Sequence, residues 1–194
     1  MELGAAAEQG GCGVKRALLA LGLVMIGTAA SAVSEVVGLL ELFNYYEYSP
    51  ALLSSGQPTR AQFPAIHAAG VEAIVNLAPV TDPGALPDEQ AVVTGLGMAY
   101  QHIPVDWDHP PRADLERFLA AMAQFQGRRV LVHCYAGSRA SAFVFLYRVL
   151  KQGAPPPAAR RTLDTIWANN PGYELPKVPQ WQQFIADGLV SGRP

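Results

Sequence analysis

The sequence predicts an α/β fold in which helices flank a central, mostly parallel sheet. Short apolar runs rich in β-branched residues alternate along the chain with longer amphipathic segments, which is the pattern of parallel strands joined by crossover helices. Half of the 194 residues are hydrophobic and 15% are charged. This composition excludes a disordered chain, a collagen-like chain and a coiled-coil rod. Because no internal repeat and no long linker interrupts the pattern, we expect a single domain over residues 33–194.

Three short segments are predicted to be strands: 72–77, 100–105 and 130–133. The last of them, VLVH, is apolar up to its final residue, which favours a buried central strand. Helices are predicted where apolar residues recur at helical spacing and where Thr, Gly or Pro marks an end. They cover residues 35–43, 59–69, 88–96, 112–126, 139–150, the segment from the prolines at 155–157 to about residue 168, and 181–189. Two loops rich in Pro and Asp separate these elements at 79–87 and 106–111.

The first 32 residues have the pattern of a secretory signal peptide. Lys15 and Arg16 precede an apolar run over 17–30, and Ala30-Ser31-Ala32 fits a small-residue cleavage site. That run is shorter than the roughly 20 apolar residues of a membrane-spanning helix. We therefore expect an exported, periplasmic protein with no stable membrane span after processing. An uncleaved anchor or a helix packed on the domain is the alternative, and a leader that does not function would leave the protein in the cytoplasm.

The charge balance argues against a nucleic-acid partner. The chain has 14 basic and 16 acidic residues and a formal net charge of −2, so no broad positive surface is expected to meet DNA or RNA. A single phosphate-binding pocket is compatible with this balance, because it needs only a few donors. Cys12 and Cys134 lie in very different contexts, so no disulfide scaffold is expected. Removal of the leader would leave Cys134 as the only cysteine, which suggests a functional thiol.

A candidate nucleophile follows the strand 130–133 directly. The strand leads into Cys134, and a loop of mostly small residues then leads into a helix. Because Gly137 permits positive φ, the loop can curl so that its amides face one point and bind an anion at the helix N-terminus. The same positive potential favours the thiolate form of Cys134, a nucleophile aimed at phosphorus or sulfur. The substrate-binding residues predicted in this loop are Tyr135, Ala136, Gly137 and Ser138.

Arg139 is predicted to be a second ligand of the anion. The helix dipole disfavours a cation at a helix N-terminus, so a bound anion explains an arginine there better than a surface charge does. Its planar guanidinium can donate to two oxygens of a tetrahedral group at once. His133, the residue before the thiol, is interpreted as a supporting core histidine and not as a catalytic base.

This loop resembles the phosphate-binding loop of protein tyrosine and dual-specificity phosphatases. The wider pattern is closer to the phosphatase-like domain of the bacterial beta-lactamase-hydrolase-like proteins, over about residues 43–189. The resemblance implies a phosphatase-like α/β fold and a cysteinyl-phosphate route that uses no metal and no cofactor. It also implies a phosphorylated small molecule or a phosphoprotein as substrate. The matching segments are 55–59 (SGQPT), Gly70 with 74–77 (IVNL), 102–105 (HIPV), the Cys134 loop, Ser141–Phe143, Leu146–Arg148, and Trp181 with Phe184–Ile185.

The spacing within the loop departs from the tyrosine phosphatase pattern. Four residues separate Cys134 from Arg139, where those phosphatases have five, and four is the spacing of rhodanese-type sulfurtransferases. A smaller ring suits a persulfide sulfur, so a sulfurtransferase that acts through a Cys134 persulfide is the first alternative. A non-catalytic phosphate-binding module is the second. Ala140 also stands where a hydroxyl residue usually helps to expel the cysteine, and Ser141 or Ser138 is the expected substitute.

The proton donor that a phosphatase needs is predicted in the loop 106–111, DWDHPP. Asp108-His109 followed by two prolines resembles the acid loop of some phosphoinositide and dual-specificity phosphatases. We therefore predict Asp108 as the general acid, with Asp106 as the other candidate. The alternative is that both carboxylates are solvated loop residues or helix caps. Trp107, between them, is expected to line the pocket or to pack on the domain.

Overall fold

The computed structural model describes residues 38–191. Cys12 and the signal peptide predicted for residues 1–32 lie outside this range. The described chain contains a five-stranded sheet with the strand order β1-β2-β5-β3-β4. Its strands are β1 (Tyr46–Ser49), β2 (Leu52–Ser55), β3 (Ala73–Asn76), β4 (Ala99–His102) and β5 (Val130–His133).

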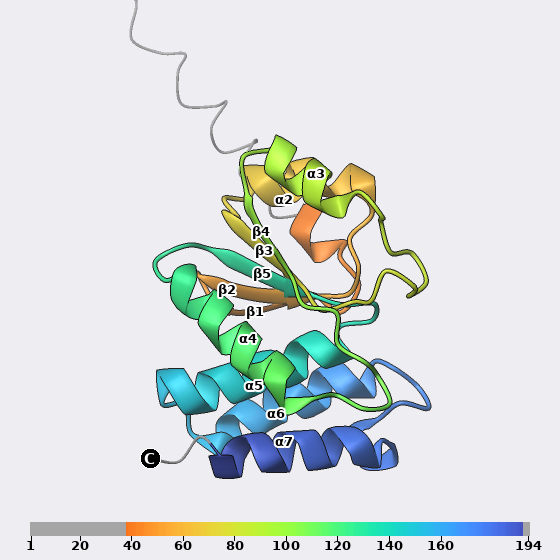
Figure 1. Ribbon diagram of the computed structural model, residues 1–194, viewed down its shortest axis with the longest axis vertical. Coiled ribbons are helices and arrows are strands. Elements are labelled where there is room, and N and C mark those ends of the chain that lie inside the picture. Colours follow the sequence, from red (N-terminus) through yellow and green to blue (C-terminus); the bar gives the residue numbers. More distant parts are fainter. Residues whose placement is uncertain (1–37, 192–194) are drawn as a thin grey trace, which may run out of the picture.

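Helices connect the strands and lie on both faces of the sheet (Figure 1). One face carries α4, α5, α6 and α7, and the opposite face carries α2 and α3 (Figure 1). The helices are α2 (Phe63–Ala68), α3 (Glu89–Gly95), α4 (Arg112–Gln124), α5 (Ser138–Gln152), α6 (Pro156–Ala168) and α7 (Pro179–Ser191), with short 3₁₀ turns η1 (Arg60–Gln62) and η2 (Leu175–Lys177).

Four of the strands run parallel, so their carboxyl ends meet at one edge of the sheet. The central strand β5 lies between β2 and β3, and β3 pairs with β4 on its other side. Only β1 is antiparallel, beside β2. The register places Ser55 and Asn76 opposite His133, and His102 opposite Asn76. Ligands of α/β sheets bind at this edge, and Cys134 is the first residue beyond it on β5.

The pleat of the central strands divides the core into two halves, because successive side chains point to opposite faces. Val130 and Val132 pack with the helices α4 to α7, in the half that also contains Trp167. Leu131 packs on the other face with Phe63 and its neighbours on α2 and α3. Every residue of β5 is buried. The strand that leads into Cys134 is therefore fixed from both faces by apolar packing.

The predicted α/β fold class and the three predicted strands are confirmed, and the helix bounds agree closely from η1 onward. The hairpin of β1 and β2 was not predicted. Each of its strands has four residues, and the residues Ser54 and Ser55, followed by Gly56, are typical of a turn in sequence. In the fold, the buried Ser54 is bonded to the hydroxyl of Tyr48 at 3.0 Å. The predicted helix 35–43 is described only from residue 38 and is helical at 38–40.

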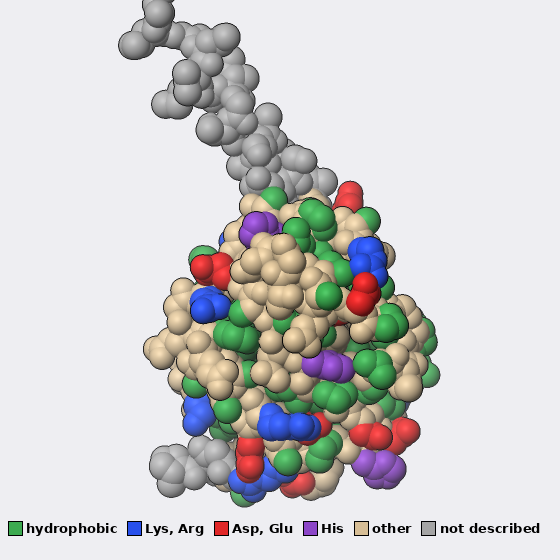
Figure 2. All heavy atoms as spheres, turned by 45° about the horizontal axis from the view of Figure 1, so that its top comes forward, with side chains coloured by type: hydrophobic (Ala, Val, Ile, Leu, Met, Phe, Trp, Pro, Cys, Tyr) green, Lys and Arg blue, Asp and Glu red, His purple; other side chains and the backbone are tan. Residues whose placement is uncertain are grey.

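The surface of the described residues has mixed charge. Figure 2 shows Lys and Arg side chains scattered among Asp and Glu on one face, without a continuous positive patch. Within residues 38–191, no helix combines the length and the apolar character that crossing a bilayer requires.

Candidate active site

Cys134 lies at the carboxyl edge of the sheet, immediately before the loop that begins α5. Its side chain is buried, with 1% of the residue exposed. The amide of Gly137 donates to the Cys134 Sγ at 3.2 Å, and Gly137 has a φ of 86°. The loop therefore curls around the sulfur, as expected from a glycine at position 137. The Gly137 amide stabilises negative charge on the sulfur.

The carbonyl groups of the loop point away from the sulfur because other segments donate to them. The carbonyl of Tyr135 accepts the Gln57 amide at 3.0 Å. Since the C=O and the next N–H of a trans peptide point in opposite directions, the amide of Ala136 faces the inside of the loop. The ring of Tyr135 is 48% exposed, so this side chain stands at the surface beside the site.

The next carbonyl, that of Ala136, is bound from two sides. It accepts Nδ2 of Asn44 at 2.9 Å and Nδ2 of Asn170 at 3.3 Å, and the amide that follows is the one that Gly137 donates to the sulfur. Asn44 itself has a φ of 53°, a left-handed conformation that asparagine tolerates better than most residues. A Cβ at position 137 would lie 2.9 Å from the Cβ of Asn44, so this contact admits only glycine in the loop.

Arg139 is buried, with 4% of the residue exposed, and most of its donors already have partners. Its Nη1 donates to the carbonyl of Val105 at 3.0 Å and lies 3.5 Å from that of Leu77. Its Nη2 forms an ion pair with the carboxylate of Asp82. Its Nε is buried and has no hydrogen-bond partner among the described residues.

The five N–H donors of a guanidinium can be counted against these partners. Two face backbone carbonyls and one faces Asp82, which leaves the Nε–H and one Nη2–H of Arg139. These two donors remain for the oxygens of a bound phosphate or sulfate group. A buried arginine with two remaining donors, next to loop amides that face inward, is an anion-binding arrangement.

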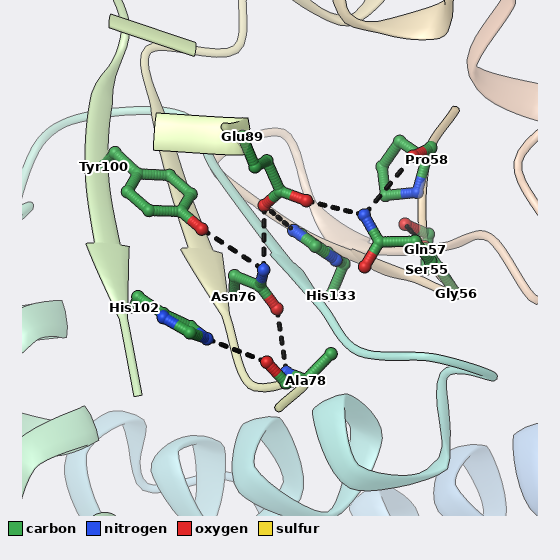
Figure 3. A network of polar contacts seen from close by, with 10 residues as sticks. All are labelled: Ser55, Gly56, Gln57, Pro58, Asn76, Ala78, Glu89, Tyr100, His102 and His133. Atoms are coloured by element: carbon green, nitrogen blue, oxygen red, sulfur yellow. Dashed lines mark hydrogen bonds and ion pairs between the residues drawn. The ribbon is translucent and has the colours of Figure 1, made fainter. Parts of the chain in front are cut away.

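A second network, built around Glu89, includes His133, the residue before Cys134 (Figure 3). Oε1 of Glu89 accepts Nδ2 of Asn76 and Nε2 of His133, both at 2.9 Å, and Oε2 accepts Nε2 of Gln57 at 2.6 Å. Burial alone would raise the pKa of Glu89, but the hydrogen bonds and charge of its partners outweigh burial and hold the pKa below its usual value. The ionised carboxylate therefore joins β3, β5 and the segment after β2.

His133 belongs to this network. The side chain is fully buried and its Nε2 faces Glu89. Glu89 has 2% of its surface exposed, so the pair has little access to water. This position agrees with a histidine that fixes the strand before the thiol.

The two aspartates of the loop 106–111 lie in different surroundings. Oδ1 of Asp106 accepts the amides of Asp108 at 2.8 Å and of His109 at 2.7 Å. These backbone bonds, with smaller contributions from the charges of His109 and Arg139, lower the pKa of Asp106. Asp108 is exposed and lines a groove of about 430 Å³ formed with the start of α4 and with α7. No residue of the loop from Cys134 to Arg139 lines that groove.

The hydroxyl groups of Ser138 and Ser141 are also used differently. Oγ of Ser141 donates to the carbonyl of Ser138 at 2.8 Å and accepts Nε1 of Trp167 at 3.1 Å. Oγ of Ser138 accepts Nδ2 of Asn170 at 2.9 Å. The Ser141 hydroxyl therefore donates its proton to a carbonyl of its own helix. The Ser138 hydroxyl accepts a hydrogen bond from Asn170, so its own proton can still be donated.

Trp107 both packs on the domain and borders the site. Its ring stacks on Trp167 with centroids 5.9 Å apart, and its carbonyl accepts Nε1 of Trp181 at 2.9 Å. The guanidinium carbon of Arg139 lies 5.9 Å from the centroid of the same ring. The edge of Tyr173, which is 57% exposed, meets this ring from outside. An aromatic wall thus runs from Arg139 to the surface.

Comparison with known proteins identifies the family. Residues 41–170 match the family described as a DSP-PTPase phosphatase fused to NAD+ kinase. The chain belongs to this phosphatase family. The predicted resemblance to tyrosine and dual-specificity phosphatases and to beta-lactamase-hydrolase-like proteins is confirmed.

Similar proteins come from several bacteria. The beta-lactamase hydrolase-like protein of Xylella fastidiosa is 32% identical over 148 residues, which cover 73% of this chain and 32% of that protein. The chain thus spans about a third of the length of the curated relatives it matches. A putative phosphatase from Shewanella putrefaciens has 42% identity and a TM-score of 0.71 over 80% of this chain and 95% of that one. TpbA of P. aeruginosa has 21% identity and a TM-score of 0.60 over 77% and 88%, a likeness of fold.

Several residues around the phosphatase loop were not predicted from the sequence. None of them lies in the segment from His133 to Ser141, and each contacts it across the fold. Glu89 reads in sequence as an ordinary acidic residue in the first turn of a helix, although its burial there is unusual for a carboxylate. The Asn-Asn pair at the end of α6 could have suggested a helix cap, but not contacts to a distant loop. The missed residues are Asn44, Asn76, Asp82, Glu89 and Asn170.

Proposed function

We propose that this chain is a cysteine-dependent phosphatase that hydrolyses phosphate monoesters through a cysteinyl-phosphate intermediate. One observation carries the proposal. The Cys134 sulfur accepts the Gly137 amide at 3.2 Å within a loop whose carbonyls are bound from outside, and Arg139 presents its unpaired Nε beside that loop. A nucleophile inside a preorganised oxyanion site is the requirement of phosphoryl transfer by a thiol.

The first step forms the bond between Cys134 Sγ and phosphorus and breaks the bond between phosphorus and the leaving oxygen. The loop amides and the remaining donors of Arg139 bind the other phosphate oxygens, whose charge grows in the transition state. The leaving oxygen takes a proton from a carboxylic acid. In the second step the carboxylate left by the acid takes a proton from water as the water oxygen attacks phosphorus. The S–P bond breaks, its electrons return to Sγ, and inorganic phosphate is released.

We assign the proton donor to Asp106 in preference to Asp108, which the sequence favoured. Asp106 lies close enough to Arg139 for the guanidinium to lower its pKa, whereas Asp108 faces the groove beside α7. The lowered pKa means that the free enzyme carries Asp106 as a carboxylate. A phosphate dianion bound next to Arg139 would raise that pKa again, because a like charge disfavours ionisation. Substrate binding thereby favours the protonated acid that the first step needs.

We assign the donor that assists release of the cysteine in the second step to Ser138. The proton of Ser141 is donated to a backbone carbonyl, so Ser141 is poorly placed for this task. The Ser138 hydroxyl lies on the loop itself and is oriented by Asn170. It is the substitute for the hydroxyl group that Ala140 lacks.

A phosphorylated small molecule or a phosphoprotein is the proposed substrate. TpbA has been solved in complex with phosphotyrosine, and here an aromatic wall of Trp107 and Tyr173 leads away from Arg139. Export to the periplasm remains part of the proposal and rests on the leader sequence alone. N-terminal sequencing of the protein secreted by its native host would test it, since cleavage after Ala32 is expected.

The four-residue spacing from Cys134 to Arg139 favours one second candidate, transfer of sulfane sulfur through a Cys134 persulfide. Intact mass spectrometry separates the two functions. The protein is incubated briefly with an aryl phosphate or with thiosulfate, and the adduct on Cys134 is identified. A phosphoryl adduct and release of the phenol support the phosphatase, and a gain of one sulfur from thiosulfate supports the sulfurtransferase.

Cys134→Ser tests the nucleophile with the same aryl phosphate. We expect turnover to fall to background, because the hydroxyl lacks the nucleophilicity of a thiolate. Cys12→Ser in the full-length chain is the matched control and should retain the wild-type rate. Phosphate binding without any turnover or adduct in the wild type would instead indicate a non-catalytic binding module.

A further inference from the structure

Asp82 lies in the segment that joins β3 to α3, and backbone turns fix its position. Its amide donates to the carbonyl of Pro79 at 3.0 Å, and its own carbonyl accepts the amide of Ala85 at 3.1 Å. Its side chain is 20% exposed and forms an ion pair with Nη2 of Arg139. The carboxylate is thus presented to the guanidinium from a defined turn.

The same segment contacts both ends of the phosphate-binding loop. Glu89, where the segment enters α3, bonds His133, the residue before Cys134. Asp82, seven residues earlier in the chain, bonds Arg139, the residue that closes the loop. Two carboxylates from one segment therefore set the positions of the residues on either side of the loop.

We propose that Asp82 is a positioning residue for Arg139, which directs the remaining donors of the guanidinium toward the phosphate; this inference rests on the proposed phosphatase function. Without Asp82, the guanidinium retains one backbone bond of 3.0 Å, a longer contact of 3.5 Å and the ring of Trp107. Both backbone contacts are made by Nη1, so without Asp82 the whole guanidinium can pivot about that nitrogen. Correct orientation matters most in the transition state, where a small misplacement costs a large factor in rate.

The charge of Asp82 has an opposite effect on binding of the ground state. A carboxylate next to Arg139 repels an incoming phosphate and weakens its attraction to the guanidinium. Asp82 therefore improves catalysis and reduces phosphate affinity. Loss of its charge should lower kcat and tighten phosphate binding together, a combination that general damage to the fold does not produce.

The experiment measures kcat for an aryl phosphate and the inhibition constant of inorganic phosphate in Asp82→Asn. We expect kcat to fall about tenfold and the inhibition constant to fall severalfold. Asp88→Asn is the matched control, because Asp88 lies in the same segment and pairs with Arg60 at the exposed surface. Both constants should stay at wild-type values in this control. An unchanged or higher kcat in Asp82→Asn overturns the inference, and so does a lower kcat with unchanged phosphate inhibition.

Asp82→Glu separates orientation from charge and provides a second variant if the asparagine variant does not fold. The charge remains while the carboxylate is moved by one methylene, so we expect kcat to fall without tighter phosphate binding. Wild-type kcat in Asp82→Glu would overturn the role in positioning. If the wild type binds phosphate but hydrolyses no ester, the proposed function fails by itself. Calorimetry then tests the role of Asp82, because the Asp82→Asn variant must still bind inorganic phosphate more tightly than the wild type does.

Discussion

The connections that follow β3 and β4 both bring a carboxylate to Arg139, but they hold it in different ways. Asp82, after β3, is paired with the guanidinium and its side chain is 20% exposed. Asp106, after β4, has a side chain that is 62% exposed and accepts hydrogen bonds from amides of its own loop. A carboxylate bonded to arginine is suited to positioning. An exposed carboxylate that accepts bonds only from its own turn can exchange those bonds for a proton and a substrate oxygen.

Asp106→Asn should produce the largest effect among changes that test this comparison. Removal of a general acid costs about a hundredfold or more in kcat for an ester with a poor leaving group. The loss should be much smaller for p-nitrophenyl phosphate, whose leaving group needs little protonation. Steady-state kinetics on both esters measures the difference, with Asp108→Asn as the control in the same loop. A larger loss in Asp108→Asn than in Asp106→Asn would restore the assignment made from the sequence.

Glu89→Gln tests the carboxylate at the other end of the segment between β3 and α3. Because Glu89 is buried against His133, loss of its charge should lower the free energy of unfolding by about 3 kcal/mol near neutral pH. Urea denaturation measures this change. The exposed pair of Arg60 and Asp88 is the internal reference, and Asp88→Asn should leave the urea midpoint unchanged.

The buried pair of Glu89 and His133 predicts how the stability of the protein changes with pH. The pKa of Glu89 is lowered by folding, so its contribution to stability is present above the unfolded value of about 4.3 and is lost as pH falls through the folded value. The gap between the wild type and Glu89→Gln should therefore close on acidification below about pH 4. A gap that stays constant down to pH 2 would mean that packing, and not the charge, accounts for the loss.

Asn170→Ala should have the smallest effect, because it removes neutral hydrogen bonds. Asn170 contacts both the Ala136 carbonyl and the Ser138 hydroxyl. If these hydrogen bonds stabilise the transition state by about 1 kcal/mol, their loss lowers kcat roughly fivefold. Rapid-quench measurements should locate the slower step in hydrolysis of the cysteinyl phosphate, because Ser138 is assigned to that step. The neighbouring Asn169 contacts Asn44 at the surface, and Asn169→Ala should retain the wild-type rate.

The fold class, three of the five strands and the loop that contains Cys134 could be predicted from the sequence. These features have local causes. Apolar residues at helical spacing define α4. The nearly continuous apolar sequences of α5 and β5 indicate a buried helix and a central strand. Within the loop, Cys134, Gly137 and Arg139 are neighbours in the chain, so the positive φ of one glycine and the start of one helix are enough to place them together.

The surroundings of the loop depend on contacts between residues that are far apart in the sequence. The pairing of β1 with β2 depends on a register that four-residue strands do not encode locally. Asp82, Glu89 and Asn170 meet the loop because β3 and β5 are neighbours and α6 packs on α5, and these contacts join residues far apart in the sequence. Asp106 and Asp108 are two residues apart in one loop and face different surroundings, since a turn of the backbone directs each side chain. The residue type determines which reactions a carboxylate can take part in. Its neighbours in space determine whether it positions an arginine, transfers a proton or is only solvated.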